Sequence, residues 1–183
     1  MLGAQFPEIL AAARTGAEWA WSRIYLDLAP LVLGYLRARR AREPEDLTGE
    51  VFLQVVRDLP RFEGGEHDFR AWVFVIARNR LVDESRRHAR RPVELAPEAP
   101  VDRRAPEDVE TQVLHEAATE RVRRIIEQLA PDQRDVLLLR VLGELTVEEV
   151  ARVIGRSPGA VKALQRRGLA AIKRTLAREG VTL

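Results

Sequence analysis

The stretch LTVEEVARVIGRSPGAVKALQRRGLAAIKR, residues 145–174, contains the start and stop signals of two consecutive helices. Thr146 and Glu149 form the Thr-x-x-Glu pattern of a capping box, which marks the first turn of a helix. Apolar residues then recur at positions 147, 150, 151 and 154, the spacing of one helix face, and Gly155 ends the helix. The first half of the stretch therefore predicts a short amphipathic helix.

The second half predicts a longer helix that begins after a short turn. Ser157 is a suitable N-cap, and Pro158 suits the first helical position. Lys162 and Arg166 lie four residues apart, so they share a face near the amino-terminal end of this helix. That end enters the major groove in helix-turn-helix proteins. We expect the helix to bury Val161, Leu164, Leu169, Ile172 and Leu176.

A short turn followed by a basic helix predicts a helix-turn-helix DNA-binding module from Thr146 to Arg178. The alternative is an ordinary helical hairpin with a solvated basic face.

Residues 152–178 hold eight basic residues and no acid, and residues 78–91 hold six arginines against two acids. Residues 92–120 hold eight acids against two arginines. Such segregation, hidden by a net charge of only +2, indicates a polyanionic partner.

The composition excludes several other classes of protein. Aromatic residues are only 5% of the 183 residues and no stretch alternates like a strand, so we expect an all-α fold. The absence of cysteine excludes disulfides and cysteine-based zinc sites. No apolar run is long enough for a membrane span, so we expect a cytoplasmic protein without membrane insertion. His67, His88 and His115 lack metal-ligand spacing and no catalytic constellation is present, so no enzyme, metal site or cofactor is predicted.

An acidic, aperiodic segment with four prolines, residues 92–106, predicts an extended linker between two small helical domains. We assign residues 1–91 to the first domain, 92–114 to the linker and 115–183 to the second domain. The second is expected to contain four helices, including the helix-turn-helix. A helix opened by Pro131 leads there to Gly143, the expected C-cap residue.

Helical periodicity predicts three or four helices in the first domain. One covers residues 19–36 with a kink at Pro30, and a second lies between Pro44 and Pro60. The Gly64-Gly65 pair marks a loop, after which Asp68 is the expected N-cap of the next helix.

Segments on both sides of the predicted linker resemble one family. LTVEEVARVIGRSPGAVKALQRRGLAAIKR and its lead-in LAPDQRDVLLLRVLGEL resemble the promoter-binding carboxy-terminal domain of extracytoplasmic-function sigma factors of bacterial RNA polymerase. PEDLTGEVFLQVVRDLPRF and FRAWVFVIARNRLVDESRR resemble the other domain of the same family. The matches occur in the right order and cover most of the chain from about residue 19 to 178. The resemblance implies a sigma factor whose partners are core RNA polymerase, promoter DNA and an anti-sigma factor.

The resemblance implies that the helix containing EDLTGEVF docks on the clamp of the largest polymerase subunit. Its contacts would be Asp46, Leu47, Glu50, Val51 and Phe52, which offer acids and an apolar patch to a basic partner. The alternative for Val51 and Phe52 is core packing. Gly49 stands where the family usually has a glutamine, which removes one polar contact and weakens the helix by about 1 kcal/mol relative to alanine.

The resemblance also implies two DNA contacts. The melted minus-ten element would meet Phe62, His67, Phe69, Arg78, Asn79, Arg80, Arg86 and Arg87. Asn79 matches the position that reads a flipped base, for which an amide edge is chemically suited, and the loop tip at residues 64–67 would set base preference. The minus-thirty-five duplex would meet Arg156, Ser157, Lys162, Ala163, Arg166, Arg167 and Lys173.

Two further roles follow from the resemblance. The apolar surface around residues 136–142 would dock on the flap of the second-largest polymerase subunit. The acids of the linker, among them Glu98, Asp102, Glu107 and Asp108, would mimic the nucleic acid that later displaces them; the alternative is that they keep a tether soluble.

Two other functions fit parts of the sequence. A stand-alone helix-turn-helix regulator with an amino-terminal sensing or dimerisation domain would bind a palindromic duplex tightly by itself. A helical protein–protein adaptor would show no salt-dependent affinity for DNA. The sigma interpretation instead predicts weak binding alone and specific initiation only with core polymerase.

Overall fold

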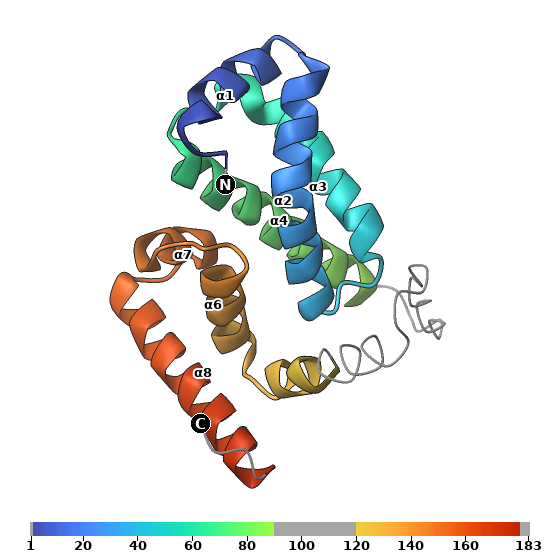
Figure 1. The fold of residues 1–183 in the computed structure, drawn as a ribbon. Coiled ribbons are helices and arrows are strands. Elements are labelled where there is room, and N and C mark those ends of the chain that lie inside the picture. Colours follow the sequence, from blue (N-terminus) through green and yellow to red (C-terminus); the bar gives the residue numbers. More distant parts are fainter. Residues whose placement is uncertain (1, 90–119, 180–183) are drawn as a thin grey trace, which may run out of the picture.

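The computed structural model describes residues 2–89 and 120–179, and all regular structure in those ranges is helical (Figure 1). The amino-terminal part contains a 3-10 turn at Gly3–Gln5, α1 at Phe6–Arg14, α2 at Glu18–Ala38, α3 at Pro44–Asp58, a 3-10 turn at Leu59–Arg61 and α4 at Glu66–Ala89. The carboxy-terminal part contains a helix at 120–127, α6 at Pro131–Val141, α7 at Val147–Ile154 and α8 at Pro158–Arg178. The all-α prediction is confirmed. The predicted linker lies outside the described residues.

Local signals in the helix-turn-helix form as the sequence predicts. Thr146 Oγ1 accepts a hydrogen bond from Glu149 N at 3.2 Å, and Thr146 N donates to Glu149 Oε2 at 2.6 Å, which completes the capping box. Gly155 ends α7 in the left-handed conformation with φ of +65°. Ser157 Oγ accepts from Ala160 N at 3.2 Å and caps α8.

The structure refines the prediction for the amino-terminal part. The fourth helix that the periodicity allowed, but did not locate, is α1, and α2 runs as one helix through Pro30 to residue 38. Helix α4 begins at Glu66, two residues before the expected N-cap Asp68. Asp68 instead reaches back from inside the first turn, where its Oδ2 accepts a hydrogen bond from Gly65 N at 3.3 Å. The expected capping role of Asp68 is therefore wrong in position, although its carboxylate still serves the start of the helix.

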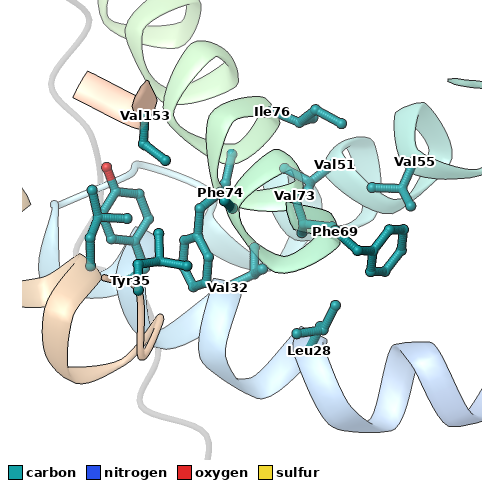
Figure 2. Close-up of a cluster of buried hydrophobic side chains, with 14 of the residues drawn as sticks. Leu28, Val32, Tyr35, Val51, Val55, Phe69, Val73, Phe74, Ile76 and Val153 are labelled. Atoms are coloured by element: carbon teal, nitrogen blue, oxygen red, sulfur yellow. The ribbon is translucent and has the colours of Figure 1, made fainter. Parts of the chain in front are cut away.

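One continuous hydrophobic core runs through both parts of the chain. It contains Tyr35 and Val32 of α2, Phe74 of α4 and Val153 of α7, which Figure 2 draws together. From the carboxy-terminal part α6 and α7 also contribute Val136, Leu138, Leu139, Val150 and Ile154. Burial of each large apolar side chain stabilises the folded state by about 1.5–3 kcal/mol. The two parts therefore pack together through a substantial apolar interface.

Two glycines are required by close packing. A Cβ on Gly143 would lie 2.6 Å from the Leu139 carbonyl oxygen and 3.2 Å from the Phe74 ring of α4. The left-handed residue after α6 is Glu144, with φ of +52°, so the expected C-cap role of Gly143 is wrong. A Cβ on Gly168 of α8 would lie 2.9 Å from Leu137 of α6.

The buried face of α8 is narrower than predicted. Its fully buried residues are Val161, Gly168 and Thr175, spaced seven apart along the line that faces the rest of the domain. Leu164, Ile172 and Leu176 are half-buried. Leu169, which was expected in the core, is 51% exposed, because it follows Gly168 directly and so points about 100° away from the buried line. Of the described helices, none combines the length and the apolar character needed to span a lipid bilayer.

Candidate nucleic-acid and polymerase interfaces

Helix α8, the second helix of the helix-turn-helix, presents a basic surface to solvent. Lys162, Arg166, Arg167 and Lys173 are exposed, and none of them forms an ion pair with another described residue. Ser157 is exposed at the start of the helix, and Ala163 is half-buried beside the cations. Arg156 is also exposed, but its Nη2 lies 2.9 Å from Asp132 Oδ2. Unpaired cations near a helix amino terminus are suited to phosphate and guanine contacts.

Three consecutive residues of α4 point in three directions, because successive side chains on a helix are about 100° apart. Arg78 Nε lies 3.4 Å from Asp135 Oδ2 in the carboxy-terminal part. Arg80 points the other way, where its Nε donates to Gln54 Oε1 at 3.0 Å on α3. Asn79 lies between them and is exposed. The amide of Asn79 is thus presented to solvent between two anchored arginines.

The aromatic residues expected to contact minus-ten DNA are instead part of the core. Phe62 and Phe69 are 8% and 1% exposed, and their ring centroids are 5.3 Å apart. Trp72 completes the cluster with its ring 5.1 Å from that of Phe62. Phe62 and Phe69 were predicted to contact DNA, and in this arrangement both rings pack in the core and are not presented to solvent.

The other minus-ten candidates are accessible. His67 is exposed near the start of α4, and Arg86 and Arg87 are exposed near its end. Arg86 lies 4.0 Å from Asp83, and Arg87 Nε donates to the Asp83 carbonyl at 3.4 Å. These local contacts leave both guanidinium groups at the surface.

The predicted polymerase-docking residues of α3 divide between two faces. Leu47, Val51 and Phe52 are buried at 4%, 0% and 6% exposure, so in this arrangement they pack in the core and do not form an exposed apolar patch. Their spacing of four residues places Leu47 and Val51 on the core side. Asp46 is exposed and Glu50 is partly exposed.

Two apolar residues that were not predicted as contacts lie on the outer side of α3. Leu53 is 67% exposed and Val56 is 48% exposed. Asp46, Glu50 and Leu53 follow one another at i, i+4 and i+7, so they share one face of the helix. The same spacing rule could have predicted from the sequence that Leu53 is exposed, because Leu53 does not belong to the series of core positions 47, 51 and 55. A Cβ atom on Gly49 would have no neighbouring atom within 4 Å, so this position borders open space.

A buried carboxylate joins the two parts of the chain. Asp135 of α6 is 2% exposed, and its Oδ1 accepts a hydrogen bond from the Tyr35 hydroxyl at 2.9 Å. Arg39 Nε lies 2.8 Å from the same oxygen, and Arg78 approaches the other. Burial raises the pKa of the Tyr35 hydroxyl above its usual range, and the Asp135 carboxylate adds to this shift. Tyr35 therefore remains a neutral hydrogen-bond donor.

A second polar cluster surrounds Arg70 of α4, whose side chain is 2% exposed. Its Nη1 lies 2.9 Å from Glu144 Oε2 and 3.5 Å from the Gly143 carbonyl, and its Nη2 lies 3.4 Å from Asp27. The loop between α6 and α7 is thereby fixed to α4, with Glu144 in its left-handed conformation.

Two surface ion pairs also link the parts. Arg152 Nη2 of α7 donates to Asp68 Oδ1 at 3.1 Å, and Arg40 Nε donates to Glu127 Oε1 at 2.8 Å. The hydrogen bond from Arg40 holds the pKa of the Glu127 carboxyl below its usual range. Within residues 2–89 and 120–179, no group of three or more His, Asp or Glu side chains is arranged to hold a metal ion.

The capped helix-turn-helix and the unpaired basic face of α8 define a helix-turn-helix nucleic-acid-binding protein. Residues 24–91 match the family Sigma-70 region 2, and residues 119–172 match the family Sigma-70, region 4. The ECF RNA polymerase sigma factor ShbA of Streptomyces griseus is 36% identical over 157 residues, which cover 79% of this chain and 81% of ShbA. BldN of Streptomyces coelicolor, also an ECF sigma factor, is 36% identical over 182 residues, 96% of this chain and 66% of BldN.

The chain therefore belongs to the extracytoplasmic-function (ECF) sigma factors, which are transcription initiation factors of bacterial RNA polymerase. Solved structures agree in fold. CnrH in complex with the cytosolic domain of CnrY is similar with a TM-score of 0.66 and 22% identity, covering 93% of this chain and 96% of that one. RpoE from Bartonella quintana, in complex with the anti-sigma factor NepR, is similar with a TM-score of 0.64 and 19% identity, covering 85% and 96%.

Proposed function

We propose that this sigma factor, acting in the cytoplasm and without chemistry of its own, docks on core RNA polymerase and places it on promoters through two DNA contacts. Helix α8 reads the minus-thirty-five duplex, and the loop before α4 together with Asn79 reads the melted minus-ten strand. The observation that carries the proposal is the unpaired basic face of α8 on one part of a chain whose other part presents Asn79 to solvent. The presence of both Sigma-70 regions favours this function over a stand-alone regulator.

Asn79 is proposed to read one base, and Asn79→Ala is expected to change preference at one position of the minus-ten element. A good bidentate amide–base pair contributes about 1–3 kcal/mol of discrimination, and alanine cannot form it. The measurement is transcription by holoenzyme from promoters randomised over that element. Arg87→Ala is the control, because loss of a phosphate contact weakens binding at all sequences alike. An unaltered preference at every position in Asn79→Ala would refute the reading role.

The polymerase-docking surface is proposed to be the outer face of α3, formed by Asp46, Glu50, Leu53 and Val56. The acids suit a basic partner, and the two exposed apolar side chains supply the patch that Leu47 and Val51 cannot. The flap-docking surface expected around residues 136–142 has fewer accessible apolar side chains than predicted, because Val136, Leu138 and Leu139 are buried. Val141, at 72% exposure, remains available to a partner.

Leu53→Asp tests this surface and is expected to weaken binding to core polymerase at least tenfold, on the order of one hot-spot residue. The fold should persist, because Leu53 is 67% exposed. Val122→Asp is the matched control, since Val122 is 55% exposed on the helix at 120–127. The affinity for core polymerase can be measured by fluorescence anisotropy. Equal losses in the two variants would argue against a docking role for α3.

The closed arrangement, in which α6 and α7 pack against α2 and α4, is proposed to be a state that the protein leaves when it engages a promoter. Arg78 is held by Asp135 there, so this side chain reaches a phosphate only after the two parts separate. We also propose an anti-sigma factor as a partner, because the similar RpoE was solved with one. Such a partner would act by covering the α3 surface.

A further inference from the structure

The chain before α2 is attached to the loop that precedes α4. Leu2 N donates to Glu66 Oε1 at 2.5 Å, and Gly3 N donates to Glu66 Oε2 at 3.0 Å. Both oxygens of one carboxylate are therefore used to hold the segment that leads into α1. Glu66 is also the first residue of α4, so this attachment fixes the carboxy-terminal end of the loop.

The other end of the same loop is held by α1. The Arg14 guanidinium, at the end of α1, donates a hydrogen bond to the Phe62 carbonyl oxygen. The Phe6 ring, at the start of α1, lies 5.6 Å from the Phe69 ring below the loop. Helix α1 thus contacts the loop at Phe62 and the first turn of α4 at Phe69, and the 3-10 turn before α1 contacts Glu66.

Between these anchors the loop has little freedom but an exposed tip. Gly64 has φ of +141°, and a Cβ there would lie 2.8 Å from the Asp68 Cβ, so only glycine fits. Gly65 N donates to Asp68 Oδ2 at 3.3 Å. Glu63, Gly64, Gly65 and His67 are nevertheless exposed. The two ends of the loop are therefore held by hydrogen bonds at Phe62 and Glu66, while its tip stays accessible to solvent.

We propose that α1 is a brace that sets the shape of the minus-ten-reading loop, with Arg14 and Glu66 as positioning residues for base preference. This inference rests on the proposed reading role of the loop. A loop held in its binding conformation loses less conformational entropy when it captures a base. Loosening either anchor spreads the loop over several conformations and lowers both the affinity and the discrimination for the minus-ten strand.

The test uses the full chain in holoenzyme with a promoter library that is randomised over the minus-ten element and has a fixed minus-thirty-five element. Arg14→Ala and Glu66→Gln are each expected to lower discrimination among minus-ten sequences about three- to tenfold, the size of one lost hydrogen bond. Affinity for core polymerase and preference in a second library, randomised over the minus-thirty-five element, should not change. Glu8→Gln, an exposed change on the same helix, is the control. Arg14→Lys retains a donor and should restore part of the discrimination.

Two outcomes overturn the brace. One is wild-type minus-ten preference in both Arg14→Ala and Glu66→Gln. The other is an equal loss at both promoter elements, which indicates general loss of structure; thermal unfolding of each variant identifies it. Asn79→Ala in the same library separates this inference from the proposed function. If Asn79→Ala changes preference and the two anchor variants do not, the reading role stands and the brace fails.

Discussion

Asp135→Ala is expected to lower the free energy of unfolding by about 3–5 kcal/mol, the range for removing one partner from a buried ionic cluster. Asp135 is 2% exposed and faces the Tyr35 hydroxyl, Arg39 and Arg78. Alanine leaves the Arg39 guanidinium, whose side chain is only 16% exposed, without its carboxylate. Unfolding in urea, followed by circular dichroism, measures the change.

Asp132→Ala provides the matched control for this prediction. Asp132 lies on the same helix three residues earlier and forms an ion pair with Arg156. The Asp132 side chain is 41% exposed and the Arg156 side chain is 56% exposed. An exposed ion pair contributes about 0–1 kcal/mol, so this variant should remain close to the wild type. Equal stability of the two variants would contradict the closed arrangement of α2, α4 and α6 in solution.

Lys162→Ala combined with Arg166→Ala is expected to reduce affinity for the minus-thirty-five duplex about ten- to hundredfold. Neither cation has an ion-pair partner among the described residues, so their removal leaves no acid unpaired. Loss of two charged contacts should also reduce the slope of log affinity against log salt by about 2. Titration of holoenzyme with duplex at several salt concentrations measures both quantities.

Arg174→Ala is the control for the α8 face. Arg174 is exposed on the same helix, but it lies two turns beyond Arg167 and so further from the amino-terminal end that is proposed to read the duplex. It should leave sequence preference unchanged, and neither α8 variant should alter binding to core polymerase. If the Lys162 and Arg166 changes lowered core binding as much as duplex binding, the assignment of this face to DNA would be wrong.

The sequence predicted the helix-turn-helix well because its signals are local. Thr146, Gly155 and Ser157 act on backbone groups within a few residues of themselves, so capping chemistry alone locates both helices. The family resemblance then supplied the function, which composition and periodicity could not.

The sequence could not reveal which apolar residues face the core and which face a partner. Phe62, Phe69 and Val51 are apolar in either role, and only tertiary packing buries them. The same holds for Asp135, an acid in the middle of a helix that reads as a surface position until Tyr35 and Arg39 are brought to it. The attachment of α1 and the turn before it to the loop that precedes α4 could not be predicted, because the contacts from Arg14 to Phe62 and from Gly3 to Glu66 span about fifty to sixty residues of sequence.

Promoter-directed initiation with purified core RNA polymerase distinguishes a sigma factor from a regulator that binds DNA by itself. The chain is incubated with core polymerase and a genomic promoter library, and the transcripts are sequenced from their 5′ ends. The sigma-factor assignment predicts a stable holoenzyme and start sites that share two spaced elements. Asn79→Ala should change preference at one position of the minus-ten element, and the combined Lys162 and Arg166 changes should weaken recognition of the minus-thirty-five element. Failure to form any holoenzyme, or tight binding of the chain alone to a palindromic duplex, would contradict it.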